Sequence, residues 1–224
     1  LRPRPAFSKG VQGLFLLSLN MNAIIRPKDD FYPTPAEATR AYLSVEQFPG
    51  GVWEPFAGGG HMSDVFRAEG IDTVATTLHE GSIEKGIEGG RDFRQETTLL
   101  RPNIASNPPY GKLDGQNDQN AVEKLLRHAF SLDPASVSMF LPMNFWGGQK
   151  RQKGFHAEFP PTRIWMFSNR FRMMPGDFDD SQTKKKHKFT FYHAWFRWEW
   201  PYRNEAPRLG LLNANDFKEG GATV

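Results

Sequence analysis

Short apolar runs alternate with amphipathic stretches along most of the chain. Apolar runs bounded by turn residues predict strands at residues 51–54, 73–77, 104–107, 136–141, 163–167 and 189–200. Apolar positions at helical spacing predict helices at residues 35–45, 61–68, 121–131 and 148–158. Strands and helices that alternate in this way predict βαβ units, and therefore an α/β fold with a mostly parallel sheet and helices on both faces.

The last predicted strand is rich in aromatic residues, and its side chains fall into two alternating sets. One set is Phe189, Phe191, His193 and Trp195, and the other is Thr190, Tyr192 and Ala194. This alternation predicts one long strand, or one arm of a hairpin, with a single buried face.

The length of the chain, 224 residues, fits one α/β domain with an ample core. The apolar run at residues 13–19 is far shorter than the roughly 20 residues of a membrane span, and it lacks the small-residue cleavage site of a secretory signal. We therefore expect no membrane association. We expect a disordered extension at residues 1–20, a domain at residues 21–203 and a loose, polar tail at residues 204–224.

The chain is mildly basic, with a net charge of +3 and a pI of about 9.1, and its basic residues are clustered. Such clusters either contact phosphates or form solvated loops. Lysines are flexible point charges that suit phosphates better than base edges, which predicts low sequence specificity. The candidate nucleic-acid contacts are Lys150, Arg151, Arg170, Arg172, Lys184, Lys185, Lys186 and Lys188.

The most distinctive segment is Asn107-Pro108-Pro109-Tyr110, at the end of a predicted strand. Two consecutive prolines fix the backbone and remove two N–H donors, so the chain leaves the sheet as a rigid lip. The lip presents an amide side chain, free carbonyls and an aromatic ring, which together suit a planar amino group. This pattern favours methyl transfer to a conjugated nitrogen, and a proline-rich surface turn is the alternative.

A second segment, residues 52–61, has the order strand, glycine loop and helix. Gly58, Gly59 and Gly60 permit tight turning and close approach of a ligand, and the next helix supplies unpaired N–H groups. Glu54 suits a hydroxyl or ammonium group better than a phosphate. The segment matches neither a Walker phosphate loop nor the dinucleotide fingerprint, and an ordinary flexible turn is the alternative.

Taken in order, these segments resemble a known family. Residues 54–60 look like the first loop of S-adenosylmethionine (SAM)-dependent methyltransferases, and residues 107–110 look like the catalytic motif of DNA N6-adenine methyltransferases. Residues 30–35 resemble the N-terminal cofactor motif of the small phage- and prophage-type enzymes. The resemblance covers roughly residues 30–200 and implies a single-domain, Rossmann-like fold with a mostly parallel, seven-stranded sheet.

The resemblance also implies a SAM site, with S-adenosylhomocysteine as the product. The implied cofactor-binding residues are Tyr32, Thr34, Pro35, Glu54, Phe56, Ala57, Gly58, Gly60, Thr77, Asp92, Phe93 and Asn107. The chain departs from the family at Thr77, which stands where an acid normally holds the ribose hydroxyls, and Glu80 is the nearest substitute. Without a charged acceptor there, we expect weak SAM binding.

By the same resemblance, the catalytic residues are Asn107, Pro108, Pro109 and Tyr110. The Asn107 side-chain oxygen and the Pro108 carbonyl would accept the two N–H groups of the target adenine. Tyr110 would stack on the base, which has to leave the duplex. The implied partner is DNA, or else RNA, with residues 170–188 as a mobile loop beside the flipped base, in the cytoplasm of a bacterial or phage-infected cell.

Two alternatives stay open. The same motif methylates adenine in RNA and glutamine side chains in proteins, and a degenerate methyltransferase would only bind nucleic acid. No metal is expected, because the six histidines show no metal-binding spacing and the chain has no cysteine. The sequence makes no prediction of the oligomeric state.

Overall fold

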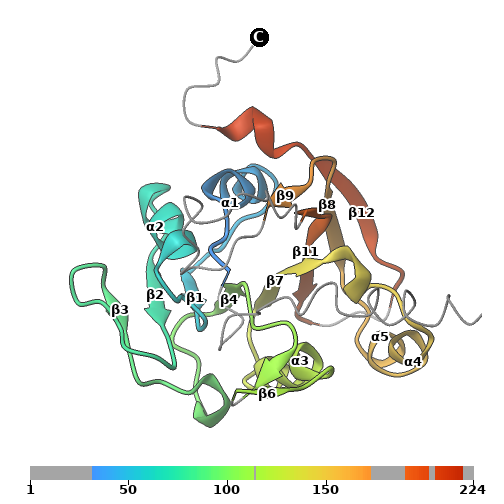
Figure 1. The fold of residues 1–224 in the computed structure, drawn as a ribbon, viewed down its shortest axis with the longest axis horizontal. Coiled ribbons are helices and arrows are strands. Elements are labelled where there is room, and N and C mark those ends of the chain that lie inside the picture. Colours follow the sequence, from blue (N-terminus) through green and yellow to red (C-terminus); the bar gives the residue numbers. More distant parts are fainter. Residues whose placement is uncertain (1–31, 114, 173–189, 202–204, 219–224) are drawn as a thin grey trace, which may run out of the picture.

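The computed structural model describes residues 32–113, 115–172, 190–201 and 205–218. Eight strands form one sheet in the order β12-β8-β11-β7-β4-β1-β2-β3 (Figure 1). All neighbouring strands are parallel except that β11 is antiparallel to both β7 and β8. The strands are β1 (Val52–Glu54), β2 (Thr73–Thr76), β3 (Ile87–Glu88), β4 (Asn103–Ser106), β7 (Ser136–Pro142), β8 (Arg163–Phe167), β11 (His193–Glu199) and β12 (Arg208–Leu212).

Helices lie on both sides of the sheet (Figure 1). On one side are α1 (Ala36–Leu43) and α2 (His61–Ala68), and on the other are α3 (Ala121–Ser131), α4 (Gln149–Lys153) and α5 (Phe155–Glu158). Single 3-10 turns form η1 (Phe93–Gln95), η2 (Met143–Phe145) and η4 (Ala214–Phe217). Within the described part of the chain, no helix has the length and hydropathy that crossing a bilayer requires.

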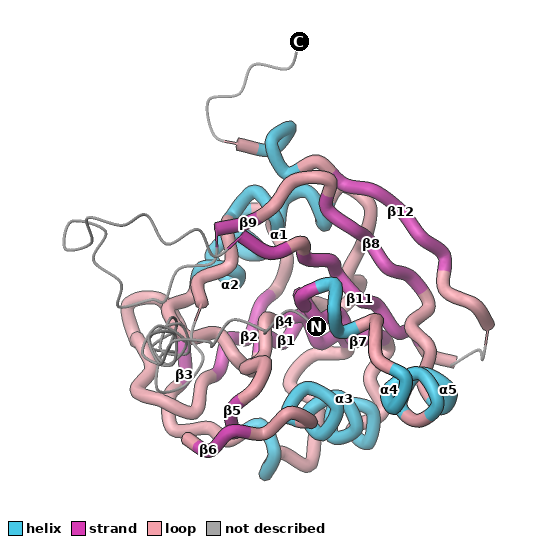
Figure 2. Tube along the Cα trace, turned by 45° about the vertical axis from the view of Figure 1, so that its right-hand side comes forward, coloured by secondary structure: helices cyan, strands magenta, loops and turns pink. Residues whose placement is uncertain are grey.

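Two short antiparallel ribbons lie outside the main sheet (Figure 2). One pairs β5 (Lys112–Leu113) with β6 (Gln116–Asn117), and the other pairs β9 (Phe171–Arg172) with β10 (Thr190–Phe191). The β5–β6 ribbon directly follows the proline motif and leads into α3. The connection after the proline motif therefore has some regular structure, which the sequence did not predict.

Each face of the sheet has its own apolar core. Under α1 and α2, Tyr42 stacks on Trp195 with ring centroids 4.3 Å apart. On the opposite face, Leu125 of α3 and Phe155 of α5 belong to the same buried cluster as Trp198. With both faces covered, the sheet is rigid, and its strand ends are the places from which side chains can reach a ligand.

The predicted seven-stranded sheet has eight strands. β12 is the edge strand beside β8 and was missed because it lies in a segment with polar and glycine-rich surroundings. Residues 204–224 were expected to be loose, but β12 pairs with β8 along its full length, and Ala214 is fully buried. A Cβ at Gly210 would lie 2.1 Å from the Trp165 ring, so glycine allows the two strands to approach.

Two further expectations about secondary structure were wrong. β11 is buried on both faces rather than one, because it lies between β7 and β8 in the interior of the sheet. Exposed Tyr192 separates β10 from β11, and Phe189 lies outside the described residues. The helix predicted at residues 148–158 is interrupted at Gly154, whose φ of −105° and ψ of −98° are not helical.

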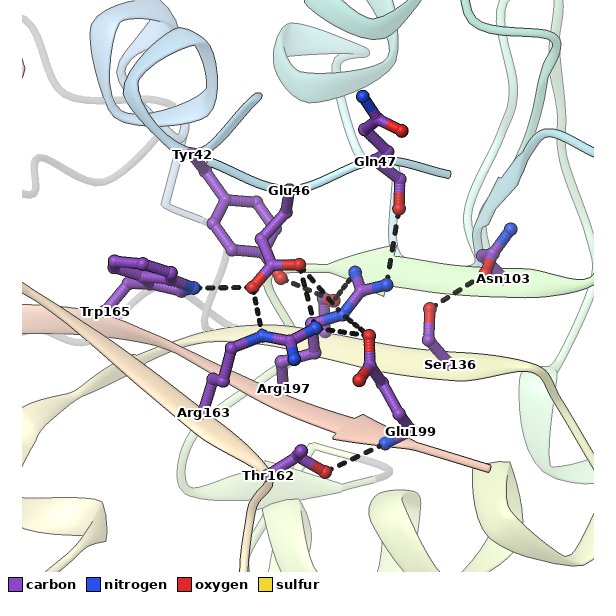
Figure 3. Close-up of polar contacts among 11 residues, drawn as sticks. Tyr42, Glu46, Gln47, Asn103, Ser136, Thr162, Arg163, Trp165, Arg197 and Glu199 are labelled. Carbon is purple, nitrogen blue, oxygen red and sulfur yellow. Dashed lines mark hydrogen bonds and ion pairs between the residues drawn. The ribbon is translucent and has the colours of Figure 1, made fainter. Parts of the chain in front are cut away.

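A buried ionic network joins the loop after α1 to β8 and β11 (Figure 3). Nε of Arg163 donates to Oε1 of Glu46 at 2.5 Å, and Nε of Arg197 lies 3.2 Å from Oε2 of the same carboxylate. Glu199 contacts both guanidinium groups, and the Trp165 indole N–H donates to Glu46 at 2.6 Å. Two acids therefore balance two arginines: Glu46 and Arg197 are buried, where an unpaired charge would be costly, and Arg163 and Glu199 are partly exposed.

Replacing Glu46 by glutamine is expected to lower the free energy of unfolding by about 3–5 kcal/mol, because Arg197, whose side chain is 5% exposed, loses one of its two anionic partners. Urea denaturation measures this change. Glu158→Gln is the matched control, since it breaks the exposed pair with Arg127 and should have little effect. Equal losses of unfolding free energy in the two variants would contradict a larger contribution from the network around Glu46.

Candidate active site

One cavity opens at the carboxyl ends of β1, β2 and β4. Most of the expected site residues lie in its wall. Pro35, Gly60, Pro108 and Tyr110 are outside the wall; Pro35 and Gly60 instead occupy the positions that begin α1 and α2. The expected residues that line the cavity are Tyr32, Thr34, Glu54, Phe56, Ala57, Gly58, Thr77, Asp92, Phe93, Asn107 and Pro109.

The glycine loop adopts conformations that other residues rarely take. Gly58 has a φ of 51° and Gly60 a φ of 84°, both in the left-handed region. A Cβ at Gly60 would lie 2.8 Å from the Cδ1 atom of Ile87, so the loop packs closely against β3. Lys85 closes the outside of the loop by donating to the Gly59 carbonyl at 2.8 Å. The loop is therefore a shaped element rather than an ordinary flexible turn.

Glu54 is a buried acid in the cavity wall with unused hydrogen-bonding capacity. Its residue is 2% exposed, and its Oε2 atom has no hydrogen-bond partner among the described residues. Burial raises the pKa of Glu54 to about 8, against an opposing effect of hydrogen bonds from Ser63. A buried carboxyl group of this kind is suited to a cationic or hydrogen-bond-donating ligand in the cavity.

The side chain of Asn107 is engaged at both ends. Its Nδ2 donates to the Tyr32 carbonyl at 3.1 Å and to the Thr34 hydroxyl at 3.0 Å. Its Oδ1 accepts from the Tyr110 hydroxyl at 2.5 Å, and that hydroxyl also lies 3.2 Å from the Phe140 carbonyl. Tyr110 was expected to face outward for stacking. Instead its ring packs on the core, and its hydroxyl lies against the amide.

The end of β2 lacks a carboxylate in the cavity wall. Thr77 is buried there, and its backbone N–H donates to the Glu88 carbonyl at 2.9 Å. Glu80, the suggested substitute, is exposed and does not line the cavity. The acids of the wall are Glu54 and Asp92.

Asp92 is held by neighbouring groups. It accepts from the backbone N–H of Arg94 at 3.0 Å, and the Arg94 guanidinium binds both of its oxygens, at 2.9 and 2.7 Å. Phe93 is buried edge-to-face against Phe56, with ring centroids 5.2 Å apart. If the adenine amino group of SAM binds at Asp92, as the resemblance implies, it has to share the carboxylate with Arg94.

Several residues of the wall were not anticipated from the sequence. They are Pro33, His61, Met62, Leu78, His79, Arg91, Arg94, Leu113, Gly115 and Leu125, whereas Pro55 belongs to the loop that was expected there. Burial and the nearby Lys85 lower the pKa of His61, which favours a neutral imidazole. Pro33, His61 and Met62 adjoin expected site residues in the sequence, whereas His79, Arg91 and Arg94 lie in segments after β2 and β3 that only the fold brings to the cavity.

The expected nucleic-acid contacts divide into three groups. Arg151 has partners within the fold: it pairs with Glu123 at 2.8 Å and lies over the Phe145 ring, 4.8 Å from its centroid. Lys150 and Arg170 are exposed, the latter over the Tyr192 ring, and Arg172 ends β9. Lys184, Lys185, Lys186 and Lys188 lie outside the described residues.

No protein-family model and no curated protein sequence matches the chain. Among solved structures, the M protein of the type I restriction enzyme EcoKI is similar, with a TM-score of 0.51 and 14% identity over 84% of this chain and 49% of that chain. A modification subunit of a putative type I restriction enzyme from Vibrio vulnificus YJ016 has a TM-score of 0.49 and 12% identity, over 79% and 45%. A TehB-like SAM-dependent methyltransferase from Corynebacterium glutamicum has a TM-score of 0.40 and 12% identity, over 72% and 86%.

The chain thus spans about half the length of the two restriction-enzyme subunits. At these identities a likeness concerns the fold alone. The similarity to the EcoKI M protein, together with the single mostly parallel sheet, shows that the chain has a Rossmann-like α/β fold.

Proposed function

We propose that the protein transfers the methyl group of SAM to the N6 amino group of adenine in DNA. The observation that carries this proposal is that Asn107, at the end of β4, and the glycine loop after β1 line one cavity. The amino-methyltransferase motif and the loop proposed to bind the cofactor come from distant parts of the sequence. Their meeting at the carboxyl edge of the sheet is what a transfer between two bound molecules requires.

The residues of the cavity fit SAM best at its methionine end. The buried Oε2 of Glu54 has no hydrogen-bond partner among the described residues and is suited to the ammonium group, while Gly58 permits close approach of the backbone. Asp92 and Phe93 are the residues proposed to bind the adenine ring of SAM. The ribose end is weaker, because neutral Thr77 stands where a carboxylate would bind both hydroxyls. When bound, SAM supplies an electrophilic methyl group on a sulfonium.

The protein's part in the reaction is to orient the target amino group. Its lone pair is conjugated with the ring, so acceptors for both N–H groups favour a pyramidal nitrogen whose lone pair faces the methyl donor. Oδ1 of Asn107 and the Pro108 carbonyl are the proposed acceptors, and their fixed dipoles stabilise the positive charge that develops. The Tyr110 hydroxyl donates to Oδ1 in this structure, so a target N–H has to use the second lone pair of that oxygen or displace the hydroxyl.

DNA is the proposed substrate because the motif and residues 30–35 resemble DNA enzymes, and because exposed basic residues such as Lys150 are available for phosphates. The direct test is incubation with labelled SAM and separate samples of DNA, RNA and protein extract. Label in DNA as N6-methyladenine supports the proposal. Label in RNA or in protein glutamine identifies the corresponding alternative, and absence of label in all three samples identifies a degenerate enzyme.

A further inference from the structure

The orientation of the Asn107 amide is fixed by the segment that precedes α1. The two contacts of Nδ2, with the Tyr32 carbonyl at 3.1 Å and the Thr34 hydroxyl at 3.0 Å, come from residues more than seventy positions away in the sequence. Thr34 is buried, with 5% of the residue exposed, so water does not readily replace its hydroxyl. Both contacts point the amino end of the amide away from Tyr110.

The Tyr32 carbonyl determines which end of the amide faces this segment. A carbonyl oxygen has no hydrogen, so it can accept from Nδ2 but cannot donate to Oδ1. Rotating the amide by 180° would place Oδ1 against the Tyr32 carbonyl oxygen and leave that carbonyl without its donor, whereas the Thr34 hydroxyl could turn to donate to Oδ1. The Tyr32 carbonyl therefore sets the direction of the amide, at about 1 kcal/mol for its hydrogen bond plus the repulsion, and the Thr34 hydroxyl adds a second contact that holds the amide in place.

The opposite end of the amide is correspondingly an acceptor. In this structure it accepts from the Tyr110 hydroxyl, which shows that the site beside Oδ1 receives a hydrogen-bond donor. An asparagine presents its oxygen to the target only if its amide is held in one orientation, whereas an aspartate would present an oxygen in either orientation. The orientation of the Asn107 amide therefore depends on Tyr32 and Thr34, which lie outside the proline motif.

We infer that Tyr32 and Thr34 are positioning residues that hold Asn107 with Oδ1 toward the target, so that the site accepts an –NH2 group and excludes a carbonyl. This inference rests on the proposed methyl transfer for its role in catalysis. It adds a selectivity that the motif alone does not supply, since a target oxygen would meet two acceptors, Oδ1 of Asn107 and the Pro108 carbonyl. Adenine then meets the requirement through its amino group, and a 6-keto purine does not.

The first experiment compares Thr34→Val with Thr34→Ser. Valine has the shape of threonine but no hydroxyl, and serine keeps the acceptor. We expect Thr34→Val to lower kcat about tenfold beyond any change in the calorimetric Kd for SAM, and Thr34→Ser to stay near the parent. A loss in both variants alike would point to packing and overturn the inference, as would an unchanged kcat in Thr34→Val.

Adding Thr34→Val to an Asn107→Asp variant tests whether Thr34 orients the Asn107 amide or merely contacts it. The two carboxylate oxygens are equivalent, so adding Thr34→Val to Asn107→Asp should cost much less in kcat than adding it to the parent. Equal costs in both backgrounds would contradict a role in orienting the amide. Non-additivity of this kind is the signature of two residues that act through each other.

A second measurement does not depend on activity. The two amide protons of Asn107, identified in NMR spectra as the signals missing from Asn107→Asp, should exchange slowly with solvent in the parent and faster in Thr34→Val. Fast exchange in the parent would overturn the inference even if methylation is observed. Slow exchange without methylation of DNA, RNA or protein would leave the orientation established and reject the proposed function.

Discussion

Replacement of Asn107 by alanine is expected to reduce methyl transfer to DNA by at least about a hundredfold while leaving SAM affinity nearly unchanged. The variant removes the acceptor that orients the target amino group, and loss of one preoriented polar group at a reacting centre typically costs about 10²–10³ in rate. Glu54 and the glycine loop remain in place. Single-turnover transfer from labelled SAM measures the rate, and calorimetry measures the affinity.

Tyr110→Phe is the matched control for this variant. It removes the hydroxyl that donates to Oδ1 of Asn107 at 2.5 Å but keeps the aromatic ring that packs on the core. We expect the phenylalanine variant to retain transfer, because Oδ1 of Asn107, the proposed acceptor for the target amino group, is unchanged. Retained turnover in Asn107→Ala, or its loss together with SAM binding, would reject the assignment of Asn107 as the acceptor for the target.

The strands that carry the site were predictable because they are marked by local pattern. β1 and β4 are short buried runs bounded by turn residues, and the Gly58–Gly60 loop and the Asn107 motif directly follow them. Parallel strands end at the same edge of a sheet, and β1 and β4 are neighbours in it, so the two motifs lie close together. This geometry required no knowledge of side-chain contacts.

Features that depend on distant partners were not predictable in this way. Arg151 was expected at a DNA surface because it lies in a basic run, yet its position is set by Glu123 and Phe145, which only the fold brings near. Gly210 lies in an edge strand that was not predicted, and the Trp165 ring of the neighbouring strand leaves no room there for a Cβ. Composition within a short window contains no information on either contact.

The Asn107 amide illustrates the same limit within the site. The sequence predicts that it is the acceptor, but its direction is set by a backbone carbonyl, that of Tyr32. The hydroxyl of Tyr110 against Oδ1 was likewise unexpected. Residue type predicted which chemistry is available, whereas the state of each group depends on neighbours that are remote in sequence.

Replacement of Glu54 by glutamine is expected to change both stability and SAM binding, in opposite directions. Burial raises the pKa of Glu54 from the ordinary 4.5 to about 8. The unfolded chain ionises this group at a lower pH than the folded protein. The contribution of the protonated carboxyl to stability is therefore fully present below pH 4.5 and is lost as the pH rises through about 8.

Glu54→Gln removes this titration while keeping the shape of the side chain. Urea denaturation of the parent without ligand should show stability falling between about pH 5 and pH 8, by an amount on the order of several kcal/mol from this group. The variant should lack that component and should be more stable than the parent at pH 8. Equal pH dependence in both proteins would contradict the raised pKa.

SAM binding should depend on pH in the opposite direction to stability and should strengthen as the pH rises. Pairing with an ammonium group favours the ionised carboxyl, so binding at pH 7 should release a proton, and Kd should fall by up to about tenfold per pH unit as the pH approaches 8. Calorimetry in buffers of different ionisation enthalpy measures the release. Glu54→Gln should bind more weakly and release no proton, whereas Glu80→Gln, which alters an exposed residue outside the cavity wall, should behave as the parent. If Glu80→Gln is the variant that loses affinity, the ribose is held from the loop after β2. If the parent shows no binding at millimolar SAM, the cavity is not a SAM site.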